Sequence, residues 1–213
     1  MTTTLHYIAD PLCGWCYGAT QLISAAAEIP GLELKVYGGG LFAGPNRRVI
    51  GREMRDFIMQ HDARMAALTG QPLGDEYLNG LLMTGDVVLD SVPPIRAVMA
   101  ADAVAGAGLQ MFKAIQSAHW MQGRRVAEIG VLREIAGEIG LDLAAFDAAW
   151  AAISDEQLMT HMNTARRLLA RHHSSGFPTF VLETDGAEQQ VDHQPFYGQP
   201  QRWVERVRAA LAA

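Results

Sequence analysis

Residues 10–18 read Asp-Pro-Leu-Cys-Gly-Trp-Cys-Tyr-Gly, and this stretch holds Cys13 and Cys16, the chain's 2 cysteines. Residues three apart lie on the same face of a helix, so the two thiols can form a disulfide or stay reduced with little backbone movement. A loop this short constrains little of the unfolded chain, so a disulfide in it would stabilise the fold only weakly. The pair therefore indicates redox chemistry rather than structural cross-linking.

The residues on either side of the pair predict different roles for the two thiols. Residues 5–9 read as a short strand that ends at the turn Asp10-Pro11, and residues 19–29 show helical periodicity. Free amides at a helix N-terminus stabilise anions, so we expect Cys13 to ionise more readily than a free thiol and to act as the nucleophile. Cys16 lies one turn further on and is expected to resolve the mixed disulfide that Cys13 forms with a substrate.

A zinc site is the main alternative for a Cys-x-x-Cys pair. A closed zinc site needs four ligands, and the sequence shows neither a second Cys-x-x-Cys nor a pair of histidines at zinc-binding spacing. The doublet His172-His173 lacks that spacing. We therefore expect no metal at Cys13 and Cys16.

Further along the chain, the pattern predicts a parallel strand pair followed by a helical block. Residues 32–37 alternate apolar and polar side chains, as a half-buried strand does, and Gly38-Gly39-Gly40 ends the run. Together with residues 5–29 this makes a βαβ unit, whose parallel strands imply a sheet covered by helices. Residues 49–173 show no convincing strand, and helices are expected there at 91–105, from 108 to about 122, and at 126–139, 143–151 and 155–171.

Strand character returns after the helical block. Residues 179–183 read as a strand, the turn Thr184-Asp185-Gly186 follows, and a weaker strand around 190–192 completes a predicted hairpin. Residues 201–211 form a final amphipathic helix.

Composition excludes several classes of protein. The chain of 213 residues is 49% hydrophobic and 19% charged, as is usual for a soluble protein with one compact core. The net charge of -6 argues against binding to nucleic acid or to anionic membranes. Residues 1–4 carry no basic side chain, and no apolar run approaches the ~18 residues that span a bilayer. We therefore expect neither a signal peptide nor a membrane partner, and a cytoplasmic location.

A second motif, Gly176-Phe177-Pro178-Thr179-Phe180, places a proline directly before the predicted strand. Together with residues 10–18 and with Gln122-Gly123-Arg124-Arg125 in the helical block, it makes the sequence resemble the DsbA family of thioredoxin-fold proteins, including its cytoplasmic FrnE-like branch. The resemblance implies an α/β thioredoxin-like fold with a large all-helical insertion. The thioredoxin-like domain would comprise residues 1–48 and 174–213, and the helical insertion residues 49–173.

The resemblance also implies site residues and an activity. Pro178 would be cis and lie against the sulfur of Cys13, while the backbone of Phe177 would pair with an extended substrate and Trp15 would shield the cysteines. The chain would be a protein-disulfide oxidoreductase or isomerase that exchanges thiols with protein or low-molecular-weight disulfides. It would need no cofactor, although glutathione is a candidate co-substrate, and a separate redox partner would recycle it.

One departure from the family pattern and two alternative functions remain open at this stage. Many thioredoxin-fold oxidoreductases carry a buried acid six residues before the first cysteine, where this chain has Tyr7, so the route of the proton is open. One alternative is a glutathione-dependent isomerase or transferase of the hydroxychromene-carboxylate isomerase or kappa type. Those relatives usually have Ser at the position of Cys13 and lack Cys16, so the presence of both favours dithiol chemistry. The other alternative is a non-catalytic, chaperone-like binding module.

Overall fold

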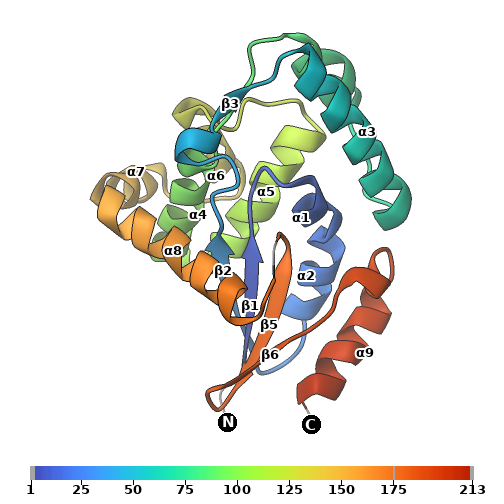
Figure 1. Ribbon diagram of the computed structural model, residues 1–213. Helices are drawn as coiled ribbons and strands as arrows, with labels where there is room; N and C mark the ends of the chain where they lie inside the picture. The colour runs from blue at the N-terminus through green and yellow to red at the C-terminus, as the bar shows by residue number, and fades with distance from the viewer. Residues whose placement is uncertain (1–2, 175, 212–213) are drawn as a thin grey trace.

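A computed structural model describes residues 3–174 and 176–211, and its centre is a four-stranded sheet of order β2-β1-β5-β6 (Figure 1). Strand β1 (Thr3–Ala9) runs parallel to β2 (Leu32–Gly38) and antiparallel to β5 (Thr179–Thr184), which pairs with β6 (Ala187–Gln190). A parallel pair from the start of the chain is thus joined edge to edge with a hairpin from its end. This is the α/β sheet of the thioredoxin-like fold that the sequence predicts.

One face of the sheet is covered by α1 (Gly14–Gly18), α2 (Thr20–Ala27) and α9 (Pro200–Leu211) (Figure 1). Alternate residues of β1 and β5 point to this side, and Tyr7 and Phe180 are both fully buried there. Trp203 of α9 packs edge-on against Phe180 with 4.9 Å between ring centroids. Aromatic burial of this kind ties the C-terminal helix to the central strands.

The opposite face is covered by α8 (Asp155–Arg171), whose apolar side packs on the residues of β1 and β5 that point the other way. Ile8 and Val181 are fully buried there against Leu168. The helix begins with a capping box, in which the Ser154 hydroxyl accepts from the Gln157 amide while the Gln157 side chain accepts from the Ser154 amide.

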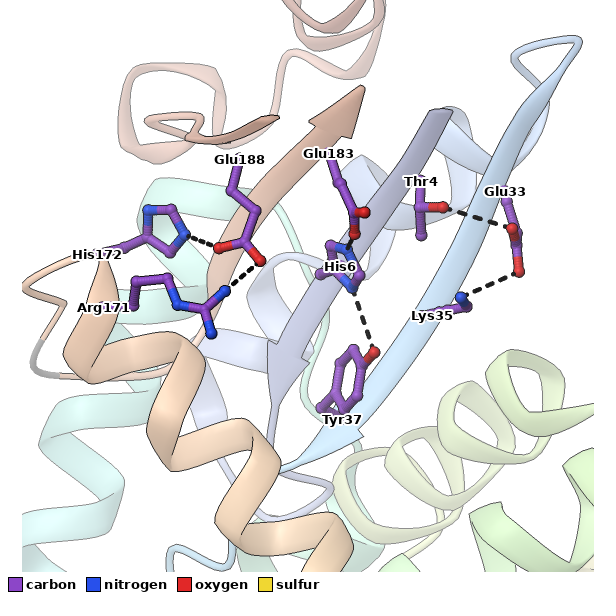
Figure 2. Close-up of polar contacts among 9 residues, drawn as sticks. All are labelled: Thr4, His6, Glu33, Lys35, Tyr37, Arg171, His172, Glu183 and Glu188. Carbon is purple, nitrogen blue, oxygen red and sulfur yellow. Dashed lines mark hydrogen bonds and ion pairs between the residues drawn. The ribbon is translucent and has the colours of Figure 1, made fainter. Parts of the chain in front are cut away.

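Polar side chains also lie on this face, and Figure 2 shows the contacts among them. His6 on β1 is buried and joins both neighbouring strands: its Nε2 lies 2.7 Å from Glu183 and its Nδ1 3.3 Å from the Tyr37 hydroxyl. Nearby, Glu188 of β6 pairs with Arg171 and His172 at the end of α8. These contacts help to hold the hairpin in register with the rest of the sheet.

Between the two halves of the sheet the chain is mostly helical (Figure 1). The helices here are α3 (Arg52–Thr69), α4 (Val92–Ala105), α5 (Gly108–Trp120), α6 (Ile129–Glu138) and α7 (Leu143–Ala152), with a π-helical turn η2 (Glu76–Gly80) and a 3₁₀ turn η3 (Leu81–Met83). Two further 3₁₀ turns are η1 (Gly44–Asn46) and η4 (Gln194–Phe196). Helix α3 contacts α1, which brings the insertion next to the cysteines. The exact division at residues 48 and 174 stays a prediction.

Three sequence predictions need correction. Residues 49–173 are not free of strand, because β3 (Arg48–Val49) pairs with β4 (Val88–Leu89). Such two-residue strands have no alternating pattern, and only the approach of distant segments creates them. The second hairpin strand begins at Ala187 rather than near 190, because pairing resumes directly after a two-residue turn. The helix expected at 126–139 begins at Ile129.

Within these described ranges, no helix is long and apolar enough to cross a membrane.

Two buried histidines should make the fold sensitive to acid. Burial lowers the pKa of His119 and that of His193 to about 4, from 6.5 in the unfolded chain. Between these values the unfolded chain binds more protons, so the free energy of unfolding falls as the pH drops from 6.5 to 4. Each histidine contributes at most about 1.4 kcal/mol per pH unit. Urea denaturation of the wild type and of His119→Gln at several pH values measures this slope, which the substitution should reduce; equal slopes would contradict the prediction.

Candidate active site

The two cysteines lie at the start of α1, as the sequence predicts. Cys13 is the N-cap residue, with extended φ and ψ of -91° and 118°, and Cys16 lies in the first turn. Both are free thiols in this structure. The side chains differ in access, because Cys13 keeps 7% of its surface exposed while Cys16 has none.

The loop before β5, which belongs to the C-terminal part of the chain, lies beside Cys13. The peptide bond between Phe177 and Pro178 is cis, as the resemblance implies. The Cys13 thiol donates a long hydrogen bond of 3.7 Å to the Phe177 carbonyl. The phenyl ring of Phe177 lies against Gly39, where a Cβ would come within 2.0 Å of the ring. A glycine after β2 therefore lets the Phe177 loop approach Cys13.

Cys16 is enclosed by groups of the central strand. Its sulfur accepts a hydrogen bond of 3.4 Å from the Asp10 amide, and the Tyr7 hydroxyl donates to its carbonyl oxygen at 3.2 Å. Burial raises the pKa of the Cys16 thiol well above its usual value, and the neighbouring Cys13 raises it further. Burial also raises the pKa of Tyr7, so its hydroxyl is a neutral hydrogen-bond donor at the position where many relatives carry an acid.

Asp10 is a buried acid that sequence reasoning treated only as part of a turn. Its Oδ1 accepts from the Leu12 amide and the Ser91 hydroxyl, each at 2.9 Å, and its Oδ2 accepts from the Leu41 amide at 2.8 Å. Burial raises the pKa of Asp10, while these hydrogen bonds act in the opposite direction. The carboxylate thus connects the cysteine loop, the segment after β2 and the start of α4.

Two cavities meet at Trp15. One of about 790 Å³ is lined by Cys13, Gly14 and mostly apolar side chains of the 41–58 segment. The other, of about 680 Å³, is more polar and extends past Pro178 towards the end of β6. The indole of Trp15 packs between His61 and Tyr197, at centroid distances of 5.5 and 5.6 Å, and Trp15 and Phe177 line both cavities. All five residues expected at the site therefore lie together.

A second missed group is Asp62 of α3, which lines the larger cavity. Its position in the middle of a largely polar helix gave no signal, because an aspartate there usually faces water. Among residues 3–174 and 176–211, no three His, Cys, Asp or Glu side chains converge in a way that could hold a metal ion.

A Cys-x-x-Cys pair at a helix start, facing a cis-proline loop on a thioredoxin-like sheet, defines a thioredoxin-fold thiol–disulfide oxidoreductase. The comparisons with known proteins agree with this class. The family described as DSBA-like thioredoxin domain matches residues 4–197, so the chain belongs to that family. No curated protein sequence matches the chain.

Solved structures give closer relatives. The cytosolic disulfide reductase DsbM from Pseudomonas aeruginosa is 44% identical, with a TM-score of 0.90 over 98% of both chains. A structure of DsbM with GSH is 43% identical, with a TM-score of 0.89 over 99% of this chain and 100% of that one. A structure from Nitrosomonas europaea, 22% identical over 100% of this chain and 98% of the other, shares the fold with a TM-score of 0.79.

Replacing Asp10 should destabilise the protein measurably. In Asp10→Ala, the Leu12 and Leu41 amides and the Ser91 hydroxyl lose their acceptor, and a buried unpaired donor costs about 1–3 kcal/mol. We expect the free energy of unfolding to fall by about 3 kcal/mol in urea denaturation at pH 7. The matched control is Asp142→Ala, which removes an exposed helix cap and should cost about 1 kcal/mol. Equal losses in the two variants would contradict the role given to Asp10.

Proposed function

We propose that this oxidoreductase works as a disulfide reductase in the cytoplasm, with Cys13 as the attacking thiol and Cys16 as the resolving thiol. The observation that carries the assignment of roles is the difference in access: Cys13 lines the larger cavity beside the Phe177 carbonyl, while Cys16 is fully buried behind it. The direction and the location are supported by the similarity to DsbM, which is a cytosolic disulfide reductase.

The proposed reaction has two thiol–disulfide exchanges. The Cys13 thiolate attacks one sulfur of a substrate disulfide, a bond forms between the two sulfurs, and the other half of the substrate leaves as a thiolate. The Cys16 sulfur then attacks Cys13, which releases the bound half as a second thiolate. The leaving thiolates take up the protons that the two cysteines give up. The substrate gains two electrons, and the protein is left with a Cys13–Cys16 disulfide.

The burial of Cys16 suits its thiol to react in the second exchange rather than the first. Because burial raises the pKa of its thiol, it stays protonated and unreactive until the mixed disulfide forms. Cys13 is the other of the chain's 2 cysteines, so it is the target of this thiol within the chain. The buried thiol is thereby directed to attack the mixed disulfide rather than a second substrate molecule.

Glutathione is the proposed co-substrate, and a protein disulfide or a mixed disulfide of glutathione with another thiol is the proposed substrate. The support is the structure of the 43% identical DsbM with GSH. The more polar cavity offers Arg64 as a cation for a glutathione carboxylate and Gln190 and Gln194 as amide partners. Trp15 and the backbone of Phe177 border this cavity and would contact the peptide chain of the ligand. Two molecules of glutathione would return the protein disulfide to the dithiol.

Cys16→Ser tests the assignment of the two thiols. With glutathione disulfide, the variant should accumulate a mixed disulfide on Cys13, seen by mass spectrometry as one added glutathionyl group, because no second thiol can release it. Turnover of a protein disulfide, with glutathione as the reductant, should fall by at least about a hundredfold. Cys13→Ser is the matched control and should neither turn over substrate nor trap glutathione. Retained turnover in Cys16→Ser would instead support a glutathione-dependent isomerase or transferase.

Trp15→Ala tests the proposed binding surface. Loss of the indole from the wall between the cavities should raise KM for a glutathione mixed disulfide by about tenfold, equivalent to about 1.4 kcal/mol, with little change in kcat. Trp150→Ala is the matched control, because Trp150 lies half-buried on α7 and lines neither cavity. Steady-state kinetics measure both, and an equal KM in all three proteins would remove Trp15 from the binding surface.

A further inference from the structure

The carboxylate of Asp62 is buried in a polar cluster beside the cysteine loop. Asp62 is 3% exposed, and its Oδ2 accepts hydrogen bonds from the Tyr77 hydroxyl at 2.6 Å and the Trp120 indole nitrogen at 3.0 Å. Its Oδ1 lies 3.3 Å from Nδ1 of His61. Donated hydrogen bonds of this kind replace the water that a buried carboxylate loses.

Oδ1 of this carboxylate also faces Gly14, the residue that follows Cys13. A Cβ added to Gly14 would lie 2.6 Å from Asp62 Oδ1. Glycine at this position lets the carboxylate lie close to the backbone that follows Cys13, beside the ring of His61. Asp62, Gly14 and Cys13 line the same cavity. The geometry therefore places a negative charge close to the proposed nucleophile.

Three of the four polar groups around Asp62 carry no charge at pH 7. Burial lowers the pKa of His119 to about 4, so this neighbour is neutral at pH 7. Burial and the carboxylate itself raise the pKa of Tyr77, which is also neutral, and Trp120 carries no charge. Among the described residues, His61 is the only basic side chain within ion-pair distance of Asp62. Buried charges interact over longer distances than exposed ones, because water screens them less.

We propose that Asp62 is a positioning residue for the redox reaction, which makes the Cys13–Cys16 pair a stronger reductant by opposing the Cys13 thiolate. A stabilised thiolate favours the reduced form and makes a pair oxidising, as in DsbA, so a charge that destabilises the thiolate has the opposite effect. The inference rests on the proposed function and gives a physical reason for its direction. It also explains why position 14 carries glycine, since any side chain there would displace the carboxylate.

The test is Asp62→Asn, which removes the charge and keeps the shape. The amide oxygen can accept from Tyr77 and Trp120, while the amide nitrogen can donate to His61. We expect the equilibrium with glutathione to shift about tenfold towards the protein dithiol, equivalent to about 30 mV for a two-electron couple. Alkylation of Cys13 by iodoacetamide at pH 6 should become several-fold faster, because more of it is thiolate.

Tyr77→Phe is the matched control. It removes one hydrogen bond from the same carboxylate but leaves the charge in place, so it should lower the melting temperature with little effect on the glutathione equilibrium. If Asp62→Asn does not fold, His61→Lys provides the second test. A lysine there places a cation beside Oδ1 and should shift the equilibrium in the same direction as Asp62→Asn.

The outcomes separate this inference from the proposed function. A wild-type protein that forms no reversible Cys13–Cys16 disulfide, or one as oxidising as DsbA, would overturn the proposed reductase and this inference with it. A reducing wild-type pair whose glutathione equilibrium and alkylation rate are unchanged in a folded Asp62→Asn, or in His61→Lys where that variant replaces it, would overturn only the role of Asp62.

Discussion

The buried carboxylate of Asp10 is the interaction on which the site depends. It stands at the end of β1 and accepts hydrogen bonds from Leu12, Leu41 and Ser91, which belong to three separate segments. A carboxyl group buried at 0% exposure is tolerated only where such donors replace water. The same residue donates its amide to the Cys16 sulfur. The cysteine loop is therefore held in one position relative to the sheet and the helical insertion, and a partly satisfied network of this kind would be costly.

The two thiols held by this loop differ in burial, and this difference sets their proposed roles. Cys16 is enclosed and its thiol pKa is raised, whereas Cys13 opens to a cavity and contacts the Phe177 carbonyl. Redox potentials in this fold differ by ~150 mV between thioredoxin and DsbA, or roughly 7 kcal/mol for two electrons. A difference of that size can arise from a few buried interactions. The helical insertion supplies one candidate, because α3 carries Asp62 to the side of Gly14.

Local patterns predicted much of the fold correctly. The alternation at residues 32–37 predicted β2, and the helix expected at 155–171 is α8. Local patterns failed where pairing depends on segments far apart. The strands β3 and β4 are two residues long and form only because residues near 48 and 89 meet, and no periodicity marks them. The start of β6 was misplaced because turn geometry, rather than β-propensity, sets the register of a hairpin.

The sequence by itself determined the chemistry: the spacing of Cys13 and Cys16, the loop at Pro178 and the resemblance to the DsbA family are properties of short contiguous segments. Only the tertiary structure decided which charged groups surround that chemistry. Asp10 and Asp62 read as a turn residue and as a solvated helix residue, because burial is a property of the assembled chain. The environment that tunes a thiol is built from residues distant in sequence, so its electrostatics follow from packing rather than from any motif.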